Sequence, residues 1–338
     1  MTAASKKLIK FLIRIIITAG LLIWVFSQID FEQFLKTVKS AKWQFLVAVW
    51  IFTVILFWIR SIKMRLILKK QDCLISTNTI FGATAVTCLY GLILPGILST
   101  GVKWYILKKG TGKSSNVLCS MIYNQWLIMT IMMVFGLAAL MFTNPASLSI
   151  SSSANQQLVP VVCGIILIAV IAVSLLLLNS RTGGKITKTI AALLKPLPEK
   201  IRQKGLEMLA QITTFQSAGA GFHLKITAIS IIDTLIGGVI IYMLSARAAN
   251  VNAPVSTFVW LCALIYILGR LPVSIANLGV REAMLVVLLA PYGVEKPQAL
   301  LMSMILFSAL IVMAVIGAGY QIFWSVTAKK SHPPINNA

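Results

Sequence analysis

The chain has few of the residues from which catalytic and metal sites are built. Its 338 residues include only eight Asp and Glu and two His, and its five Cys are dispersed without a CxxC pair. Acid–base and metal chemistry needs carboxylates, imidazoles or thiolates gathered at close spacing. We therefore expect no metal site, no cofactor, no disulfide framework and no enzyme activity.

Apolar sequence is abundant instead. Hydrophobic residues make up 58% of the chain and charged residues 11%. Several runs approach the roughly 20 apolar residues that span a bilayer core. This composition is typical of an all-α, polytopic integral membrane protein forming a single transmembrane domain over residues 1–338. The apolar runs predict six full spans, at residues 11–27, 43–59, 121–142, 158–178, 226–244 and 299–324.

The charge balance is strongly basic, with 30 Lys and Arg and a formal net charge of +22. Nucleic acid is one explanation, but no basic stripe with interleaved aromatics supports it. Lys and Arg in cytoplasmic loops, facing anionic membrane phospholipids, are the commoner cause. Residues 60–70 are expected to be such a loop. Residues 179–225 are expected to be a cytoplasmic amphipathic segment with two surface helices or, alternatively, a solvated loop.

Two stretches combine helix breakers with positive charge inside apolar sequence. The first, at residues 94–103, reads LP, five residues, then GVK, and the second, at 271–281, reads LP, six residues, then GVR. Broken helices at membrane depth are tolerated where they line a cavity. A short loop at the membrane surface is the alternative. The expected helix-breaking residues are Pro95, Gly96, Pro272 and Gly279.

Loop charge decides how the first stretch is placed. If residues 80–94 crossed the membrane, the basic residues 103–113 would be external and the uncharged residues 143–157 cytoplasmic, against the positive-inside bias. A re-entrant or broken hairpin removes this conflict. The scheme then has two hairpins of opposite orientation, cytoplasmic termini, and an inverted repeat of residues 43–142 and 226–324. Such repeats with interrupted helices point to a transporter with its site near the midplane.

Charges within the apolar sequence are the candidate substrate-binding residues. An Arg fork at Arg270 or Arg281 would suit the phosphate of an anionic lipid, with Glu282 holding Arg281 or meeting an amine. The alternative is an Arg281–Glu282 pair and an interfacial Arg270 that serve only topology. Asp233, in mid-span, is expected either to pair with one of these arginines or to contact substrate.

The first hairpin and the span after it contribute further candidates. Lys103 is the counterpart of Arg281 in the repeat, or a plain cytoplasmic charge. Asn124 and Gln125 could contact substrate, although hydrogen bonding between helices is the commoner use of intramembrane amides.

With these motifs in place, nearly the whole chain resembles the flippase-like transmembrane region of the lysylphosphatidylglycerol synthase family. The most specific part is LPVSIANLGVRE at residues 271–282, followed by YGV at 292–294; LPG at 94–96 is weaker. The resemblance implies an all-helical protein of the bacterial inner membrane that moves or handles lipids or lipid-linked molecules.

The sequence departs from the family pattern at two places. Ser99-Thr100-Gly101 stands where an acidic residue is frequent, and Asn124-Gln125 where an acid–Arg pair is frequent. The aminoacyl-transfer domain of the full synthases is absent from this chain, so synthase activity is not implied. We expect translocation of a phospholipid or lipid-linked anion. The alternatives are a membrane-bound lipid or glycan transferase and a scaffold for a partner lipid-modifying enzyme. A homo-oligomer is left open.

Overall fold

Helices make up all the regular structure in the parts of the chain that can be described. The computed structural model describes residues 31–92, 94, 96–143, 153–178, 199–269 and 277–330, with positions 23, 27, 184 and 191. Its elements are α2 (Phe31–Lys39), α3 (Trp43–Lys70), α4 (Thr77–Gly91), α5 (Gly96–Thr111), α6 (Ser114–Thr143), α8 (Ser153–Leu178), α10 (Glu199–Gln216), α11 (Ala220–Thr234), the π-helix η1 (Leu235–Ile240), α12 (Ile241–Ala248), α13 (Val255–Leu268), α14 (Val280–Leu289), the 3-10 helix η2 (Ala290–Tyr292) and α15 (Lys296–Lys330).

Five helices are long and apolar enough to cross a membrane, which confirms the all-α polytopic class. They are Trp43–Lys70, Ser114–Thr143, Leu158–Leu176, Ala220–Ala248 and Lys296–Thr327. These match five of the six predicted spans, and the remaining one, residues 11–27, lies outside the described residues. The Ala220–Ala248 span is continuous through α11, η1 and α12.

The basic stretch at residues 60–70 is helical, so its prediction as a loop is wrong. It forms the last three turns of α3, which ends at Lys70. Residues 60–70 hold no Gly or Pro, and Met64, Ile67 and Leu68 lie at helical spacing and are buried. Burial of this apolar face stabilises the helix, and the basic residues between these positions do not interrupt it.

Two pairs of short helices stand between long spans, as the two predicted hairpins require. In the first pair α4 packs against α5, which begins at Gly96, and in the second α13 packs against α14. Gly279, at φ +81°, precedes α14. A left-handed backbone of this kind favours glycine, as expected for a helix-breaking position. Pro95 and Pro272 lie outside the described residues.

The two helical pairs begin beside opposite ends of α3. At its carboxyl end, Lys113 Nζ, just after α5, donates to the carbonyl of Asp72, just before α4, over 3.1 Å. At its amino end, the Lys42 amide donates to the carbonyl of Ala248, which ends α12 shortly before α13, over 3.1 Å. The first pair therefore begins and ends beside the carboxyl end of α3, while the second begins beside its amino end.

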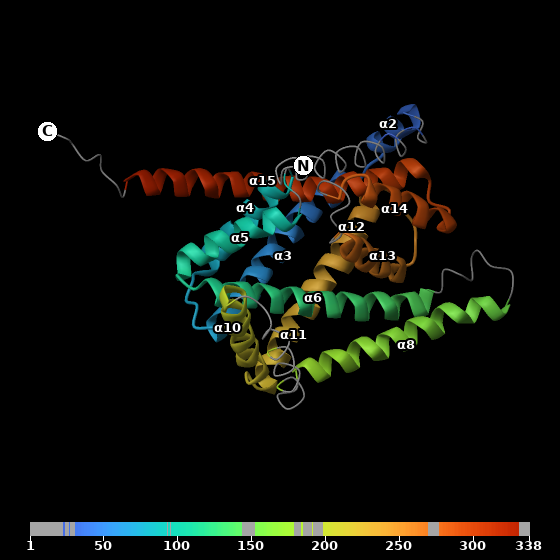
Figure 1. Ribbon diagram of the computed structural model, residues 1–338. Helices are drawn as coiled ribbons and strands as arrows, with labels where there is room; N and C mark the ends of the chain where they lie inside the picture. Colours follow the sequence, from blue (N-terminus) through green and yellow to red (C-terminus); the bar gives the residue numbers. More distant parts are fainter. Residues whose placement is uncertain are drawn as a thin grey trace, which may run out of the picture.

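Each pair packs on the long helix of the other half. The first helix of one pair, α4, lies against α15, and the first helix of the other, α13, lies against α6. Figure 1 shows α15 across the upper part of the molecule and α6 running below it, with α3 and α12 between them. Both contacts are close at a glycine. A Cβ at Gly317 would lie 2.3 Å from the Ala85 carbonyl oxygen, and one at Gly136 would lie 2.5 Å from Ala263 Cβ.

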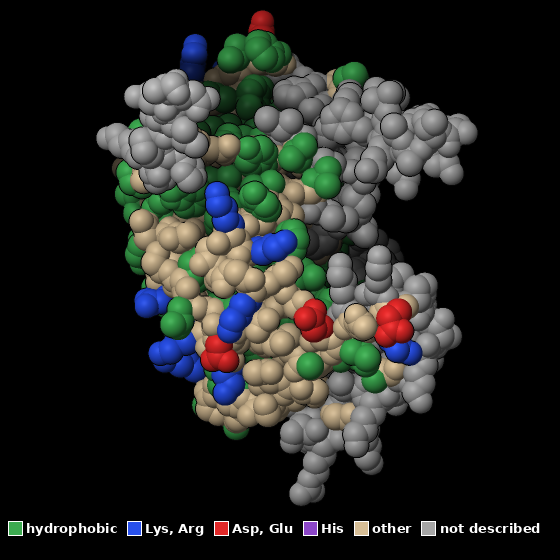
Figure 2. Space-filling view, turned by 60° about the vertical axis from the view of Figure 1, so that its left-hand side comes forward, with side chains coloured by type: hydrophobic (Ala, Val, Ile, Leu, Met, Phe, Trp, Pro, Cys, Tyr) green, Lys and Arg blue, Asp and Glu red, His purple; other side chains and the backbone are tan. Residues whose placement is uncertain are grey.

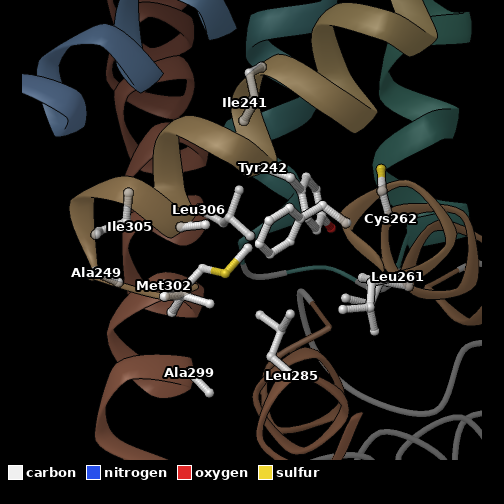
Figure 3. Close-up of a cluster of buried hydrophobic side chains, with 14 of the residues drawn as sticks. Ile241, Tyr242, Ala249, Leu261, Cys262, Leu285, Ala299, Met302, Ile305 and Leu306 are labelled. Carbon is white, nitrogen blue, oxygen red and sulfur yellow. The ribbon is translucent and has the colours of Figure 1, made fainter. Parts of the chain in front are cut away.

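The largest apolar core joins α12, α13, α14 and α15. Tyr242, Leu261, Leu285 and Met302 from these four helices face one another in Figure 3. This core fixes the second helical pair against the last span.

The surface helix α10 covers the carboxyl end of α3 and the amino end of α6. Phe215 stacks on Tyr123 with ring centroids 4.4 Å apart, and Gln71 Nε2 donates to the Gln211 carbonyl over 2.8 Å. Residues 199–216 are thus helical, at the place of the second predicted surface helix; most of the first falls outside the described residues. Figure 2 shows Lys and Arg side chains gathered over the middle and lower part of one face, with hydrophobic side chains mainly above them.

Candidate functional site

A buried carboxylate joins two cations between α3 and α11. Arg60 Nε and Lys63 Nζ each lie 2.8 Å from a different oxygen of Asp233. Asp233 is 1% exposed and Lys63 is fully buried, whereas 28% of the Arg60 side chain is exposed. Buried charges of this kind persist only when they are paired and hydrogen-bonded. Arg60 is therefore the accessible member of these three residues, and Lys63 and Asp233 are the buried ones.

The helix that carries Asp233 changes its winding directly after it. Residues Leu235–Ile240 form a π-helix, and this segment contains Gly237 and Gly238. A Cβ at Gly237 would lie 3.6 Å from Arg60 Nη2, and one at Gly238 would lie 3.4 Å from Cys262 Sγ. π-helical turns occur frequently at functional sites. Here the missing side chains let α3 and α13 approach the same segment from different directions.

Lys103 adds a third positive charge. Its ammonium is close enough to Arg60 and Lys63 for the three charges to repel one another, with Cys88 of α4 beside it. Within the described ranges Lys103, which is half-buried, forms no hydrogen bond or ion pair. Asp233 pairs with Arg60 and Lys63, and Lys103 has no carboxylate partner among the described residues, so the cluster has a formal charge of +2. We call these four residues the cationic cluster.

Arg60 keeps most of its hydrogen-bonding capacity. A guanidinium has five N–H donors, and Asp233 accepts only from Nε. The terminal Nη groups have no partner among the side chains and carbonyls that the structure describes. Phe57 lies under the guanidinium, 5.4 Å from ring centroid to Cζ. Asp233 thus holds Arg60 through its Nε, and Phe57 contacts one face of the guanidinium. The two Nη groups remain available to bind another acceptor.

An amide and a phenol border the cluster. Gln125 Nε2 of α6 donates to the Tyr266 hydroxyl of α13 over 3.1 Å, and Tyr266 lies within electrostatic range of Arg60. Gln125 therefore makes the hydrogen bond between helices that was the alternative to a substrate contact. The neighbouring Asn124 Oδ1 is buried, and no partner for it is found in the described residues.

Arg281 and Glu282 form a separate unit at the start of α14. Arg281 donates to Ser303 Oγ over 2.7 Å and to Glu282, and Ser303 Oγ donates in turn to Glu282 Oε1 over 2.8 Å. The second Glu282 oxygen accepts from the Gly279 amide over 2.7 Å. Arg281 and Glu282 are 6% and 4% exposed. Each charge is neutralised by its neighbour, so this unit caps a helix and ties it to α15.

The structure gives Asp233 partners other than the predicted ones. Arg60 and Lys63, and not Arg281, hold its carboxylate; the other candidate, Arg270, lies outside the described residues. A buried carboxylate pairs with the cations that helix packing brings to it, and α11 packs on α3. The sequence carried a signal for these partners: Arg60 and Lys63 lie one turn apart in a stretch without helix breakers.

The two similar sequence motifs, GVK at residues 101–103 and GVR at 279–281, differ in the residue that follows them. Gln125 follows Lys103 at the spacing of 22 residues that separates Ser303 from Arg281. Arg281, however, is followed by the acid that neutralises it, and Lys103 is followed by Trp104. Arg281 is therefore neutralised by the adjacent Glu282, whereas Lys103 has no acidic neighbour in the sequence.

The cationic cluster has the donor set of an anion site and lacks that of a metal site. In the described part of the chain no three His, Cys, Asp or Glu residues are grouped so that they could hold a metal ion. An Arg fork and a Lys ammonium at membrane depth can bind a phosphate or carboxylate. Intramembrane charges of this kind mark substrate or ion pathways.

Comparison with known proteins gives the family. The model of the lysylphosphatidylglycerol synthase TM region matches residues 11–319. No curated protein matches the chain significantly, and no solved structure does so either. The match covers all five candidate spans apart from the carboxyl end of the last one. The chain thus belongs to the lysylphosphatidylglycerol synthase transmembrane-region family, membrane domains associated with lipid synthesis or transport.

Proposed function

We propose that the protein translocates a phospholipid or other lipid-linked molecule with an anionic head group across the membrane. The observation that carries this proposal is the cationic cluster, in which Arg60 and Lys103 are half-buried and have no anionic partner for their free donors. Burying an unpaired cation is costly. A head-group phosphate would supply the missing charge while the acyl chains stay in the bilayer.

The path would run between the two helical pairs. They open at opposite ends of α3, and each packs on the long helix of the other half. We propose that residues 43–142 and 226–324 form an inverted repeat, as transporters that alternate access around a central site commonly do. The π-helical segment next to Asp233 packs against α3 and α13, which belong to the two proposed repeats.

Arg60 is the residue to change in a transport assay. Purified protein is reconstituted into vesicles with a lipid that carries a fluorescent anionic head group, and a membrane-impermeant quencher reports the exposed leaflet. We expect Arg60→Gln to lower the transfer rate at least about tenfold, the loss that corresponds to about 1.4 kcal/mol of head-group binding. Arg60→Lys should keep partial activity, because it keeps the charge and loses the fork.

Arg65→Gln is the matched control. Arg65 lies on the same helix, is exposed, and donates only to Thr77 over 3.3 Å. Its variant should transfer lipid at the wild-type rate. Equal rates for Arg60→Gln, Arg65→Gln and wild type, with all three folded, would rule out a role of the cluster in transport.

Transport without chemical change is part of the proposal. Lipid extracted after the assay should be identical to the lipid added, and a new product would instead support a lipid or glycan transferase. We further propose the bacterial inner membrane as the location, with both termini in the cytoplasm. The basic ends of α3 and α5 then face the cytoplasm, in agreement with the positive-inside bias.

A further inference from the structure

The cationic cluster is more positive than one singly charged anion can neutralise. Arg60 and Lys63 pair with Asp233, and Lys103 lies within electrostatic range of both cations, so the formal charge of the cluster is +2. We infer that the cluster binds a terminal phosphate dianion, the head group of a phosphomonoester or pyrophosphate lipid, in preference to the singly charged phosphodiester of common phospholipids. This inference rests on the proposed function and specifies its substrate class.

The charge argument follows from the surroundings of the cluster. Lys63 and Asp233 are buried, and apolar side chains such as Leu56 and Phe57 lie on the same helix turns. Electrostatic energies are several times larger in such surroundings than in water. A phosphodiester would leave one positive charge unbalanced there. A phosphomonoester carries about −1.5 to −2 charges at neutral pH and would balance both.

The hydrogen-bonding geometry also favours a terminal phosphate. Asp233 binds only the Nε of Arg60, which leaves its two Nη groups for the oxygens of a bound phosphate, and Lys103 lies within electrostatic range of Arg60. A terminal phosphate has three unesterified oxygens and can meet both partners at once, whereas a phosphodiester has only two. Phosphate binding to the Nη groups need not displace Asp233, because Asp233 contacts Arg60 Nε and Lys63 Nζ and neither Nη group.

The second half of the chain offers no equivalent site in its described residues. Arg281 is neutralised by Glu282 and bonded to Ser303, so it has no surplus charge. One terminal phosphate per chain is therefore expected.

The test is a binding titration of the detergent-solubilised full chain, read by native mass spectrometry. The probes are phosphatidic acid, a phosphomonoester, and phosphatidylglycerol, a phosphodiester, with identical acyl chains. We expect phosphatidic acid to bind at least about tenfold more tightly, at one molecule per chain; tenfold corresponds to about 1.4 kcal/mol. Inorganic phosphate and pyrophosphate are tested as competitors. Competition at low concentration identifies a free phosphate as the ligand, and its absence identifies the lipid.

Variants of Lys103 test whether the preference for phosphatidic acid depends on the charge of the cluster. Lys103→Met removes one positive charge and should reduce the preference for phosphatidic acid to less than about threefold, while Lys103→Arg should restore it. Lys109→Met is the control, because Lys109 is exposed on the same helix and its variant should keep the full preference. Thermal unfolding of each variant shows that the protein is folded.

The outcomes distinguish the inference from the proposed function. Equal affinity for the two lipids, with lipid transfer still dependent on Arg60, overturns the dianion inference and leaves translocation standing. A preference that survives Lys103→Met also overturns it. If neither lipid binds and transfer does not depend on Arg60, both proposals fail.

Discussion

Lys63 Nζ and Asp233 Oδ2 lie 2.8 Å apart in a position where neither side chain is open to the surface. The two residues belong to helices that are far apart in the sequence. Their pairing fixes α3 against α11 and sets the position from which Arg60 presents its fork. The stability of this arrangement can be measured separately from transport.

Removal of the carboxylate should destabilise the protein strongly. Asp233→Ala leaves the buried Lys63 ammonium without a partner, and breaking a buried pair in this way costs about 3–5 kcal/mol. The free energy of unfolding in detergent should fall by that amount. Lys63→Met should cost less, because Asp233 keeps Arg60. An Asp233→Ala protein as stable as wild type would show that the pair does not hold the helices.

The Arg281–Glu282 unit should matter for folding. Glu282→Ala removes the partner of Arg281 and the acceptor of the Gly279 amide, so a loss of about 3–5 kcal/mol is expected. Glu295→Ala, at an exposed acid nearby, should change the free energy of unfolding by less than about 0.5 kcal/mol.

Transport by the folded fraction of Arg281→Lys distinguishes a structural role from substrate binding. A rate per folded molecule equal to wild type fits the helix-capping role. A reduced rate per folded molecule would bring Arg281 back as a substrate contact, as the sequence predicts.

Two glycines on α15 form a matched pair for helix packing. A Cβ at Gly317 would lie 2.3 Å from the Ala85 carbonyl, whereas a Cβ at Gly319 would meet nothing within 4 Å. Gly317→Ala should therefore destabilise the protein by about 1–3 kcal/mol through overpacking. Gly319→Ala should be neutral or stabilising, since Ala favours a helix by up to about 1 kcal/mol. Thermal unfolding of the two variants tests this prediction. Equal unfolding temperatures would contradict the close contact at Gly317.

Accessibility labelling tests the opposed helical pairs. Cysteines introduced at Lys109 and Lys39, both exposed, should react with impermeant maleimide from opposite sides of the membrane. Lys109 lies in the last turn of α5, which ends the first pair beside the carboxyl end of α3, and Lys39 precedes the amino end of α3. Labelling of both from one side would remove the inverted arrangement.

The native Cys73, which lies within electrostatic range of Lys113, should interfere little with this experiment. Burial raises the pKa of the Cys73 thiol. Its thiolate, which is the reactive form, is therefore scarce at neutral pH. Cys73→Ser should leave the background signal nearly unchanged.

Much of the architecture follows from apolar run length. Residues 121–142 and 299–324 were long enough to be read as spans, and loop charge placed the first hairpin. Arg60 and Lys63 could not be assigned in this way, because a cluster of basic residues after an apolar run is typical of a loop. Their pairing depends on α11 bringing a single acid to them, and apart from the one-turn spacing of Arg60 and Lys63 such a contact between distant segments leaves no trace in local composition.

The predicted site residues separate into two groups for a similar reason. Asp233, Lys103 and Gln125 come to one region, whereas Arg281 and Glu282 lie at the start of α14 with their own partners. Adjacent opposite charges such as these can neutralise each other, and sequence alone does not show whether a third group binds to them. The sequence shows one difference between the two motifs: Arg281 is followed by Glu282, which can neutralise it, whereas Lys103 is followed by Trp104.

The glycine contacts at Gly317 and Gly136 limit how this molecule can change shape. At Gly317 the backbones of α4 and α15 are in direct contact, and at Gly136 the α6 backbone lies against Ala263 Cβ of α13, so neither position leaves room for one helix to slide past the other. The α4–α15 and α6–α13 pairs should each move as a rigid body, with any rocking confined to the junction where α3 meets the π-helical turn. A disulfide across that junction would then stop turnover, while one within either rigid pair would leave it running.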